Sequence, residues 1–280
     1  MEYKSFNVEI KDHVAHVQLS RPEAMNSMNQ DFWLELPQCM KALDISGDVR
    51  AIVLSSTGKH FSAGMDLAVF SNPKLVPMTG DPGRMGENLR RVVLMLQGTL
   101  TAMEEIRIPV LSAIQGGCIG GALDMVCASD SRYCTEDAYF TIKETELGMT
   151  ADVGTLQRLP KLIPEGVVRE LAYTGRKFTA QEAQQLGFVN KVFKDQAEML
   201  DGVMTIAAQI AKNSPLAVAG CKEMINYTRD HTVADSLKYM ATWQSGMFRP
   251  NDMMKTFAAK ATKQQAEFDG VWPKKELFEL

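Results

Sequence analysis

Long hydrophobic runs are missing from this sequence of 280 residues. No apolar stretch reaches the roughly 18 residues that a membrane-spanning helix needs, so we expect no membrane partner. The first residues, Met1-Glu2-Tyr3-Lys4, show neither a signal-peptide core nor an Arg- and Ser-rich transit segment. The final Phe278-Glu279-Leu280 shares only its Leu with a peroxisomal Ser-Lys-Leu ending. We therefore expect a soluble intracellular protein, cytoplasmic by default, or mitochondrial or peroxisomal if the source is eukaryotic.

A surplus of positive charge is missing too. The chain has 30 Lys and Arg residues against 34 Asp and Glu residues, which gives a formal net charge of −4. Proteins that wrap nucleic acid carry a basic footprint, so this balance argues against a nucleic-acid partner. The hydrophobic share of 45% and the charged share of 23% are those of an ordinary globular protein.

The chain offers little that could hold a metal ion or a disulfide framework. Its five cysteines form no Cys-x-x-Cys pair, and their odd number suits a reducing compartment. His13 and His16 lie three apart in a strand-like run, so their side chains should point to opposite faces of the strand. We therefore expect no metal site.

The common nucleotide-binding and nucleophile motifs are absent as well. Neither GxGxxG nor GxxxxGK[ST] nor GxSxG fits the glycine cluster at 116–121, which lies between an expected strand and an expected helix. Glycines before a helix leave backbone N–H groups open to a ligand. They also permit tight packing of a strand against a helix, and from this feature alone both interpretations stay open.

The expected secondary structure divides the chain into two parts. Strands alternate with helices up to about residue 193, and helices with short breaks at 213–215 and 249–251 follow from about residue 196. This order predicts an α/β core followed by a helical C-terminal part. The expected strands are Phe6–Ile10, Val14–Leu19, Ala51–Leu54, Pro109–Ile114 and Tyr139–Ile142. The expected helices include 29–43, 122–128 and one capped by Thr179. Residues 71–86 contain three prolines and three glycines and are expected to form a long loop.

Three acidic residues lie near these turns in apolar or small surroundings. Asp124 lies in the apolar run 119–128, Glu144 follows the strand at 139–142, and Asp152 lies eight residues later. A carboxyl group in such surroundings is either hydrogen-bonded or kept for proton transfer with a raised pKa. Taken singly, each residue is more simply explained as a helix cap or a surface charge.

A second turn of small residues, Phe61–Leu67, follows the buried strand at 51–54, and its N–H groups could complete an anion-binding pocket. Two clusters of open N–H groups and two or three carboxyls in one apolar site would suit proton movement next to a carbonyl group. The N–H groups would stabilise an enolate oxygen, and the carboxyls would act as base and acid.

Four segments match one family pattern: Ser20–Asn26, Phe61–Leu67, Ile114–Gly121, and Thr174-Gly175 with the stretch from Ala180 to Val189. Together they resemble the enoyl-CoA hydratase/isomerase family, also called the crotonase family, along nearly the whole chain. The resemblance implies that the first segment touches the CoA moiety and that the next two supply an oxyanion hole. The oxyanion-hole and substrate-binding residues that it implies are Ala63, Gly64, Met65, Asp66, Leu67 and Gly121.

The three acidic positions point to one branch of this family. Hydratases carry Glu at the positions of Asp124 and Glu144 and Gly at that of Asp152, whereas the set Asp–Glu–Asp is similar to that of Δ3,5-Δ2,4-dienoyl-CoA isomerases. The resemblance implies that these three residues are catalytic and shift a 3,5-diene to a 2,4-diene on an acyl-CoA thioester. One of Glu144 and Asp152 would take a proton at C2 and the other would return one at C6, with Glu144 preferred at C2 and Asp152 at C6. Asp124 would tune the pair or orient a water. No cofactor is expected, because coenzyme A is part of the substrate.

The resemblance also implies a fold and an assembly. The fold is an α/β spiral of ββα repeats over residues 1–195, followed by a helical trimerisation region over 196–280, and the family usually forms homotrimers or hexamers. Two alternatives stay open: a 2-enoyl-CoA hydratase, and a non-catalytic scaffold or RNA-binding member of the family. Met65 in place of a commoner Ile, and Met149-Thr150 in place of Leu-Ala, should alter the pocket for the acyl chain.

Overall fold

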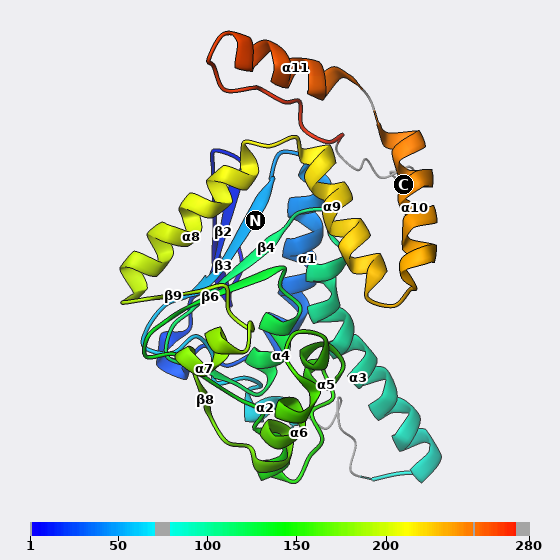
Figure 1. Ribbon diagram of the computed structural model, residues 1–280. Coiled ribbons are helices and arrows are strands. Elements are labelled where there is room, and N and C mark those ends of the chain that lie inside the picture. Colours follow the sequence, from blue (N-terminus) through cyan, green and yellow to red (C-terminus); the bar gives the residue numbers. More distant parts are fainter. Residues whose placement is uncertain (1, 71–78, 249, 273–280) are drawn as a thin grey trace.

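A twisted six-stranded sheet forms the centre of the protein in the computed structural model, which describes residues 2–70, 79–248 and 250–272 (Figure 1). The first two strands pair as an antiparallel hairpin, and every later pairing in this sheet is parallel. In spatial order the strands are β1 (Phe6–Lys11), β2 (Val14–Leu19), β3 (Ala51–Ser56), β4 (Val110–Ile114), β6 (Ser131–Thr135) and β9 (Lys191–Phe193).

Both faces of the central strands are covered, as parallel strands require. All residues of β3 and β4 are buried. Val53 and its neighbours on one face pack against helix α8 (Gln196–Ala211), whereas Ile52 and Leu54 point into the main core on the other side. That core is closed by α1 (Gln30–Ser46) and α3 (Pro82–Glu105), which run side by side (Figure 1).

A smaller sheet lies beside the first and begins inside the glycine cluster. Its strands are β5 (Gly117–Ile119), β7 (Tyr139–Thr141) and β8 (Phe178–Thr179), in that order. Phe140 of β7 and Phe178 of β8 stack on each other and meet Phe188 edge to face, with ring centroids 5.1 to 5.7 Å apart. The sequence predicted β7 from its aromatic and β-branched residues. It missed β5, which begins with a glycine of the cluster, and β8, which has only two residues and so shows no strand pattern.

The remaining helices connect and follow the strands. They are α2 (Leu67–Phe70), α4 (Gly121–Cys127), α5 (Thr155–Arg158), α6 (Glu165–Thr174), α7 (Ala180–Gln185), α9 (Pro215–Thr228), α10 (Val233–Met247) and α11 (Pro250–Ala261), with 3-10 turns at Pro22–Ala24, Glu144–Leu147 and Leu159–Lys161. No helix in the described ranges is long and apolar enough to cross a membrane.

The prediction of a long loop over residues 71–86 is wrong at its C-terminal end. Asp81 caps α3 by accepting a hydrogen bond from the Arg84 N–H, and Pro82 occupies the first turn, where a missing N–H costs nothing. The helix therefore begins at Pro82, which is one of the prolines that suggested a loop. Residues 71–78 lie outside the described part of the chain.

Of the C-terminal helices α8 to α11, the first packs on the central sheet and the other three lie beyond it. Helix α8 covers the central sheet, while α9 and α10 form an antiparallel pair and α11 lies past the end of the sheet (Figure 1). The expected boundary at residue 195 thus falls directly before a helix that packs on the core. Lys222 of α9 is buried and donates to the carbonyl oxygens of Met103 and Ile108 and to the Asp130 carboxylate, which fastens the outer pair to the core.

Candidate active site

Two segments that are far apart in the sequence meet along strand β5. The Ser62 N–H donates to the Gly117 carbonyl oxygen, and the Ile119 N–H donates to the Ser62 carbonyl oxygen, each at 3.1 Å. This short ladder places the turn at 61–67 against the end of β5, where α4 begins at Gly121. The two small-residue turns that the sequence singled out are therefore neighbours.

The N–H groups of Met65 and Gly121 are open at this junction. Neither donates a hydrogen bond within the described ranges of the chain, and a Cβ added to Gly121 would lie 3.5 Å from the Met65 nitrogen. Gly64 has φ +82°, and a Cβ there would collide with the Ile119 carbonyl oxygen. Only glycine permits this close approach, so two unused donors stand side by side where an oxyanion could bind.

The other predicted residues of the turn have different tasks. The N–H groups of Ala63, Gly64 and Asp66 donate to the Met25 carbonyl oxygen, the Ser62 hydroxyl and the Met28 carbonyl oxygen, respectively. The Asp66 carboxylate accepts from the Ser27 hydroxyl and lies 3.8 Å from the Arg21 guanidinium. Leu67 starts α2 with a side chain that is 68% exposed. From 63 to 66, Met65 alone keeps a free N–H, and the rest of the turn holds it in place.

Asp124 is a completely buried carboxyl group one helical turn beyond Gly121. Its Oδ1 accepts a hydrogen bond of 2.5 Å from the Thr155 N–H, and its Oδ2 has no partner in the described structure. Burial raises the pKa of Asp124 to about 6, although the hydrogen bonds from Thr155 and the charge of Arg158 act in the opposite direction. This group can therefore change its protonation near neutral pH.

Glu144 follows β7 and reaches back to the glycine cluster. A Cβ added to Gly120 would lie 3.1 Å from the Glu144 Oε1, while its Oε2 is buried and has no partner in the described structure. Burial raises the pKa of Glu144 to about 7, and the negative charges of Asp124 and Asp152 add to this effect. A carboxylate with a pKa near 7 is a suitable general base at neutral pH.

Asp152 stands at the exposed edge of this group. Its side chain is solvent-accessible, yet partial desolvation raises its pKa as well. Its charge raises the pKa values of both Asp124 and Glu144, so all three predicted acids lie within electrostatic range of one another. The first and the last of these carboxyls lie 28 positions apart in the sequence. The structure brings all three together, one from α4 and two from later turns.

Two supporting residues were not found from the sequence. The Thr155 N–H binds Asp124, and Arg158 influences the Asp124 carboxyl through its charge. Gly154, with φ +134°, makes possible the turn that leads directly into Thr155 at the start of α5. A backbone N–H bond to a side chain 31 residues away leaves no pattern in one sequence, so no signal could have revealed it.

The raised pKa of Glu144 predicts a pH-dependent gain in stability on substitution. The folded carboxyl titrates near 7 instead of its ordinary 4.5, so ionising it above pH 7 destabilises the fold, whereas below pH 4.5 it is neutral in both the folded and the unfolded states. Glu144→Gln should raise the free energy of unfolding by roughly 1–3 kcal/mol at pH 8 and by nearly nothing at pH 4.

Urea unfolding at the two pH values measures this difference. Glu136→Gln is the matched control, because Glu136 is exposed and makes no ion pair in the described structure. A Glu144→Gln protein that is less stable than the wild type at pH 8 would contradict a desolvated carboxyl at this position.

Comparisons with known proteins agree with this geometry. The mouse and Arabidopsis thaliana proteins named Δ3,5-Δ2,4-dienoyl-CoA isomerase are 44% and 42% identical to this chain; each match covers 95% of the chain, and 82% and 97% of the relative. The crystal structure of an enoyl-CoA hydratase from Bacillus anthracis superposes with a TM-score of 0.86 at 29% identity, over 95% of this chain and all of that one. The fold is therefore the crotonase fold that the sequence predicted. The sequence profile of the family described as enoyl-CoA hydratase/isomerase matches residues 9–271, and the chain belongs to this family.

Proposed function

We propose that this protein is a Δ3,5-Δ2,4-dienoyl-CoA isomerase, which moves the two double bonds of a 3,5-dienoyl-CoA to the 2,4 positions. The observation that carries the proposal is the set of three mutually interacting carboxyls, Asp124, Glu144 and Asp152, beside the open N–H groups of Met65 and Gly121. Relatives with this name from mouse and Arabidopsis thaliana match 95% of the chain.

The two N–H groups would hold the reacting carbonyl. The thioester oxygen accepts hydrogen bonds from Met65 and Gly121, and these bonds strengthen as a proton leaves C2 and negative charge moves onto the oxygen. The resulting dienolate spreads its charge along the conjugated chain as far as C6. No metal or cofactor takes part in this scheme, because coenzyme A is carried by the substrate itself.

The carboxyls divide the proton transfers between the two ends of the diene. Glu144, whose pKa is about 7, takes the proton from C2, and Asp152 returns a proton to C6. One carboxyl cannot serve both carbons without moving, because four bonds separate them. Asp124 does not transfer a proton in this scheme, but its charge raises the pKa of Glu144 and so makes it a stronger base.

The alternative reaction, addition of water to a 2-enoyl-CoA, is disfavoured by Asp152. The hydratase pattern has Gly at this position, and here an acid stands there and acts on the pKa values of the other two. A non-catalytic scaffold or RNA-binding role would not need the buried carboxyl groups of Asp124 and Glu144 beside the partly desolvated Asp152, because such burial costs folding free energy. The cellular location stays a prediction; the names of the mouse and Arabidopsis relatives place those proteins in mitochondria and peroxisomes.

A spectrophotometric assay tests the reaction. The purified protein is given a 3,5-dienoyl-CoA in one cuvette and a 2-enoyl-CoA in another. Growth of the absorbance of a conjugated 2,4-dienoyl thioester with the first substrate, and no hydration of the second, is the expected result. Hydration of the 2-enoyl-CoA without isomerisation would make the protein a hydratase.

Asp152→Asn should nearly eliminate isomerisation in the same assay. The amide has almost the same shape as the acid but cannot exchange a proton at neutral pH, so kcat should fall by about 10²–10⁴-fold while the affinity for the CoA ester is kept. Retention of more than roughly a tenth of the wild-type kcat would make Asp152 a structural residue and would refute the two-acid scheme.

Gly121→Val should abolish turnover in a folded protein. Gly121 has a helical backbone that accepts valine, but a Cβ there lies 3.3 Å from the Met28 Sδ and 3.5 Å from the Met65 nitrogen, so the branched side chain would fill the place of the thioester oxygen. Loss of an oxyanion donor costs about 10²–10³-fold in kcat. Gly166→Val in the first turn of α6 is the matched control, because a Cβ there meets no heavy atom within 4 Å. Equal activity of the two variants would remove Gly121 from the site.

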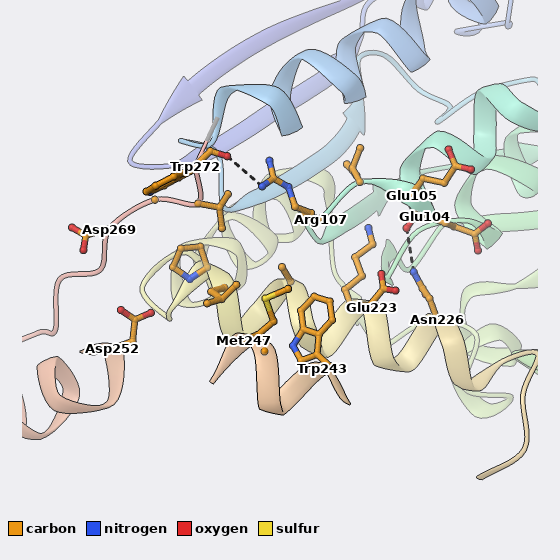
Figure 2. Close-up of a pocket in the computed structure, with 18 of the residues that line it drawn as sticks. Glu104, Glu105, Arg107, Glu223, Asn226, Trp243, Met247, Asp252, Asp269 and Trp272 are labelled. Atoms are coloured by element: carbon orange, nitrogen blue, oxygen red, sulfur yellow. Dashed lines mark hydrogen bonds between the residues drawn. The ribbon is translucent and has the colours of Figure 1, made fainter. Parts of the chain in front are cut away.

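We also infer that the chain assembles as a homotrimer or a hexamer through its outer helices. These helices expose many large apolar side chains, among them Ile225, Leu237, Met240, Met254 and Phe257. A pocket of about 1020 Å³ lies between α9, α10 and residues 269–272. Figure 2 shows Trp243, Met247 and Trp272 on its walls. The described residues of one chain leave this surface exposed, and patches of this kind mark association surfaces.

Light scattering at micromolar concentration checks the assembly. The expected mass is three or six times the 31.0 kDa of one chain. A stable monomer under these conditions would show that the apolar surface of the outer helices has another purpose.

A further inference from the structure

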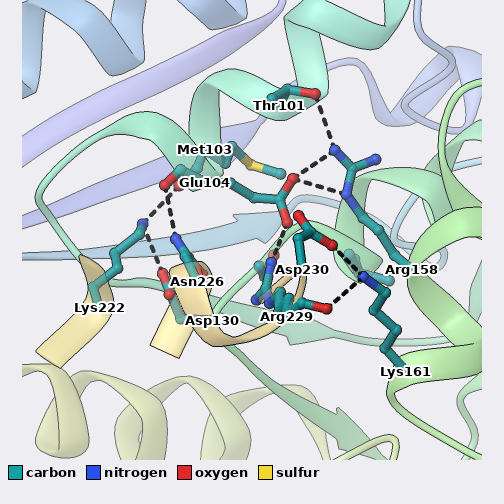
Figure 3. Close-up of polar contacts among 12 residues, drawn as sticks. Thr101, Met103, Glu104, Asp130, Arg158, Lys161, Lys222, Asn226, Arg229 and Asp230 are labelled. Carbon is teal, nitrogen blue, oxygen red and sulfur yellow. Dashed lines mark hydrogen bonds and ion pairs between the residues drawn. The ribbon is translucent and has the colours of Figure 1, made fainter. Parts of the chain in front are cut away.

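One face of helix α3 carries three polar side chains that point at the segment holding Asp152. Gln97, Thr101 and Glu104 are spaced by four and three residues, so they lie along one side of the helix. The segment opposite them runs from Asp152 to Arg158 and includes α5. Figure 3 shows Thr101 and Glu104 turned toward Arg158.

The contacts fasten this segment at both of its ends. At the first end, the Gln97 Nε2 donates to the Asp152 carbonyl oxygen at 2.7 Å. At the other end, the Arg158 guanidinium donates to the Glu104 Oε2 through Nε at 2.8 Å and Nη2 at 2.5 Å, and Nη2 also donates to the Thr101 hydroxyl at 2.9 Å. The Glu104 and Arg158 side chains are only 16% and 17% exposed, so water screens this pair little.

The fastened segment contains the groups that the site needs. Asp152 supplies one carboxyl, and the Thr155 N–H holds the Asp124 carboxylate in place. Arg158 folds back over the segment, where its Nη1 donates to the Val153 carbonyl oxygen, and a Cβ on Gly154 would collide with it. The position of Arg158 therefore fixes the path of the chain between Asp152 and Thr155.

Glu104 also connects this segment to the outer helices. Its Oε1 forms an ion pair with the Arg229 guanidinium at the end of α9, and its backbone carbonyl oxygen accepts from the Asn226 side chain (Figure 3). The Glu104 carboxylate thus bridges two arginines from different parts of the fold. Each of the two ion pairs helps to orient the carboxylate for the other pair. Beside α5, Lys161 pairs with Asp230 and adds a second link between the same two regions.

We propose that Glu104 is a positioning residue that, through Arg158 and together with Gln97, sets the distance of Asp152 and Thr155 from the reacting diene. This inference rests on the proposed isomerase function. Glu104 touches no reacting atom in this scheme; it holds the chain that carries one acid and orients another. Misplacement of a catalytic group by about 1 Å can cost on the order of 10²-fold in rate, so losing this anchor should be visible in turnover.

The first experiment compares Glu104→Gln, Arg158→Gln and the double variant in the dienoyl-CoA assay. Each single variant should lower kcat by about 10–100-fold with KM within about twofold of the wild type, because the CoA ester still binds while the acid is displaced. The double variant should be no worse than the worse single one, since both changes break the same link. Glu105→Gln is the matched control, as Glu105 is the exposed neighbour on the same helix and should keep the wild-type kcat.

A second variant covers the case in which Glu104→Gln fails to fold. Gln97→Met keeps the side-chain length, lies on a partly exposed face and removes only the donor to the Asp152 carbonyl oxygen. It should lower kcat by several-fold at unchanged melting temperature, whereas Gln184→Met on the exposed face of α7 should not. Circular dichroism melts identify which variants are folded.

Each outcome decides one question. A folded Glu104→Gln or Gln97→Met protein with kcat within about twofold of its control overturns the positioning role, as does a KM that rises while kcat is kept. Additive losses in the double variant would mean that Glu104 and Arg158 act separately, which also overturns it. A wild-type protein that does not isomerise the dienoyl-CoA would instead refute the proposed function on which the inference rests.

Discussion

A carboxyl group that is fully removed from water lies at the centre of this structure, and the surrounding segments are arranged around it. Asp124 is 0% exposed, and among the described residues only one of its two oxygens has a hydrogen-bond partner. Burying such a group costs free energy unless it is paired or stays neutral. The Thr155 N–H and the nearby charge of Arg158 offset part of that cost. Because Asp124 lies one turn beyond Gly121, the same short helix supplies an acid and an open N–H donor to one site.

The electrostatics of the site follow from this placement. Burial together with the charges of Asp124 and Asp152 brings the pKa of Glu144 to about 7, where it can act as a base at the pH of the cell. The same desolvation lowers the stability of the folded protein, as is common where the needs of an active site oppose those of folding. The ion pairs that Glu104 makes with Arg158 and Arg229 tie the segment of Asp152 to the rest of the fold.

The sequence predicted those parts that have a local physical signature. The apolar run at 51–54 became the buried strand β3, and Thr179 caps α7 by accepting a hydrogen bond from the Glu182 N–H, as its spacing from Glu182 indicated. Strand β6 was missed because Ser131–Thr135 shows no alternation of apolar and polar residues, and β5 because glycines conceal it. The three acids were singled out by their apolar or small surroundings, and the resemblance to a family then suggested their catalytic roles. The contacts of Thr155 and Glu104 join residues more than 30 positions apart, and a single sequence carries no trace of them.

The central claim, that separate acids serve the two ends of the diene, is tested most directly by isotope incorporation in heavy water. A single turnover of a 3,5-dienoyl-CoA in D₂O should place one solvent deuterium at C6 of the 2,4-dienoyl product, because Asp152 exchanges its proton with solvent before it delivers it. Nuclear magnetic resonance of the product locates the label. Transfer of the original C2 proton to C6, with no deuterium at that carbon, would mean that one group carries the proton along the whole chain, and it would contradict the two-acid account.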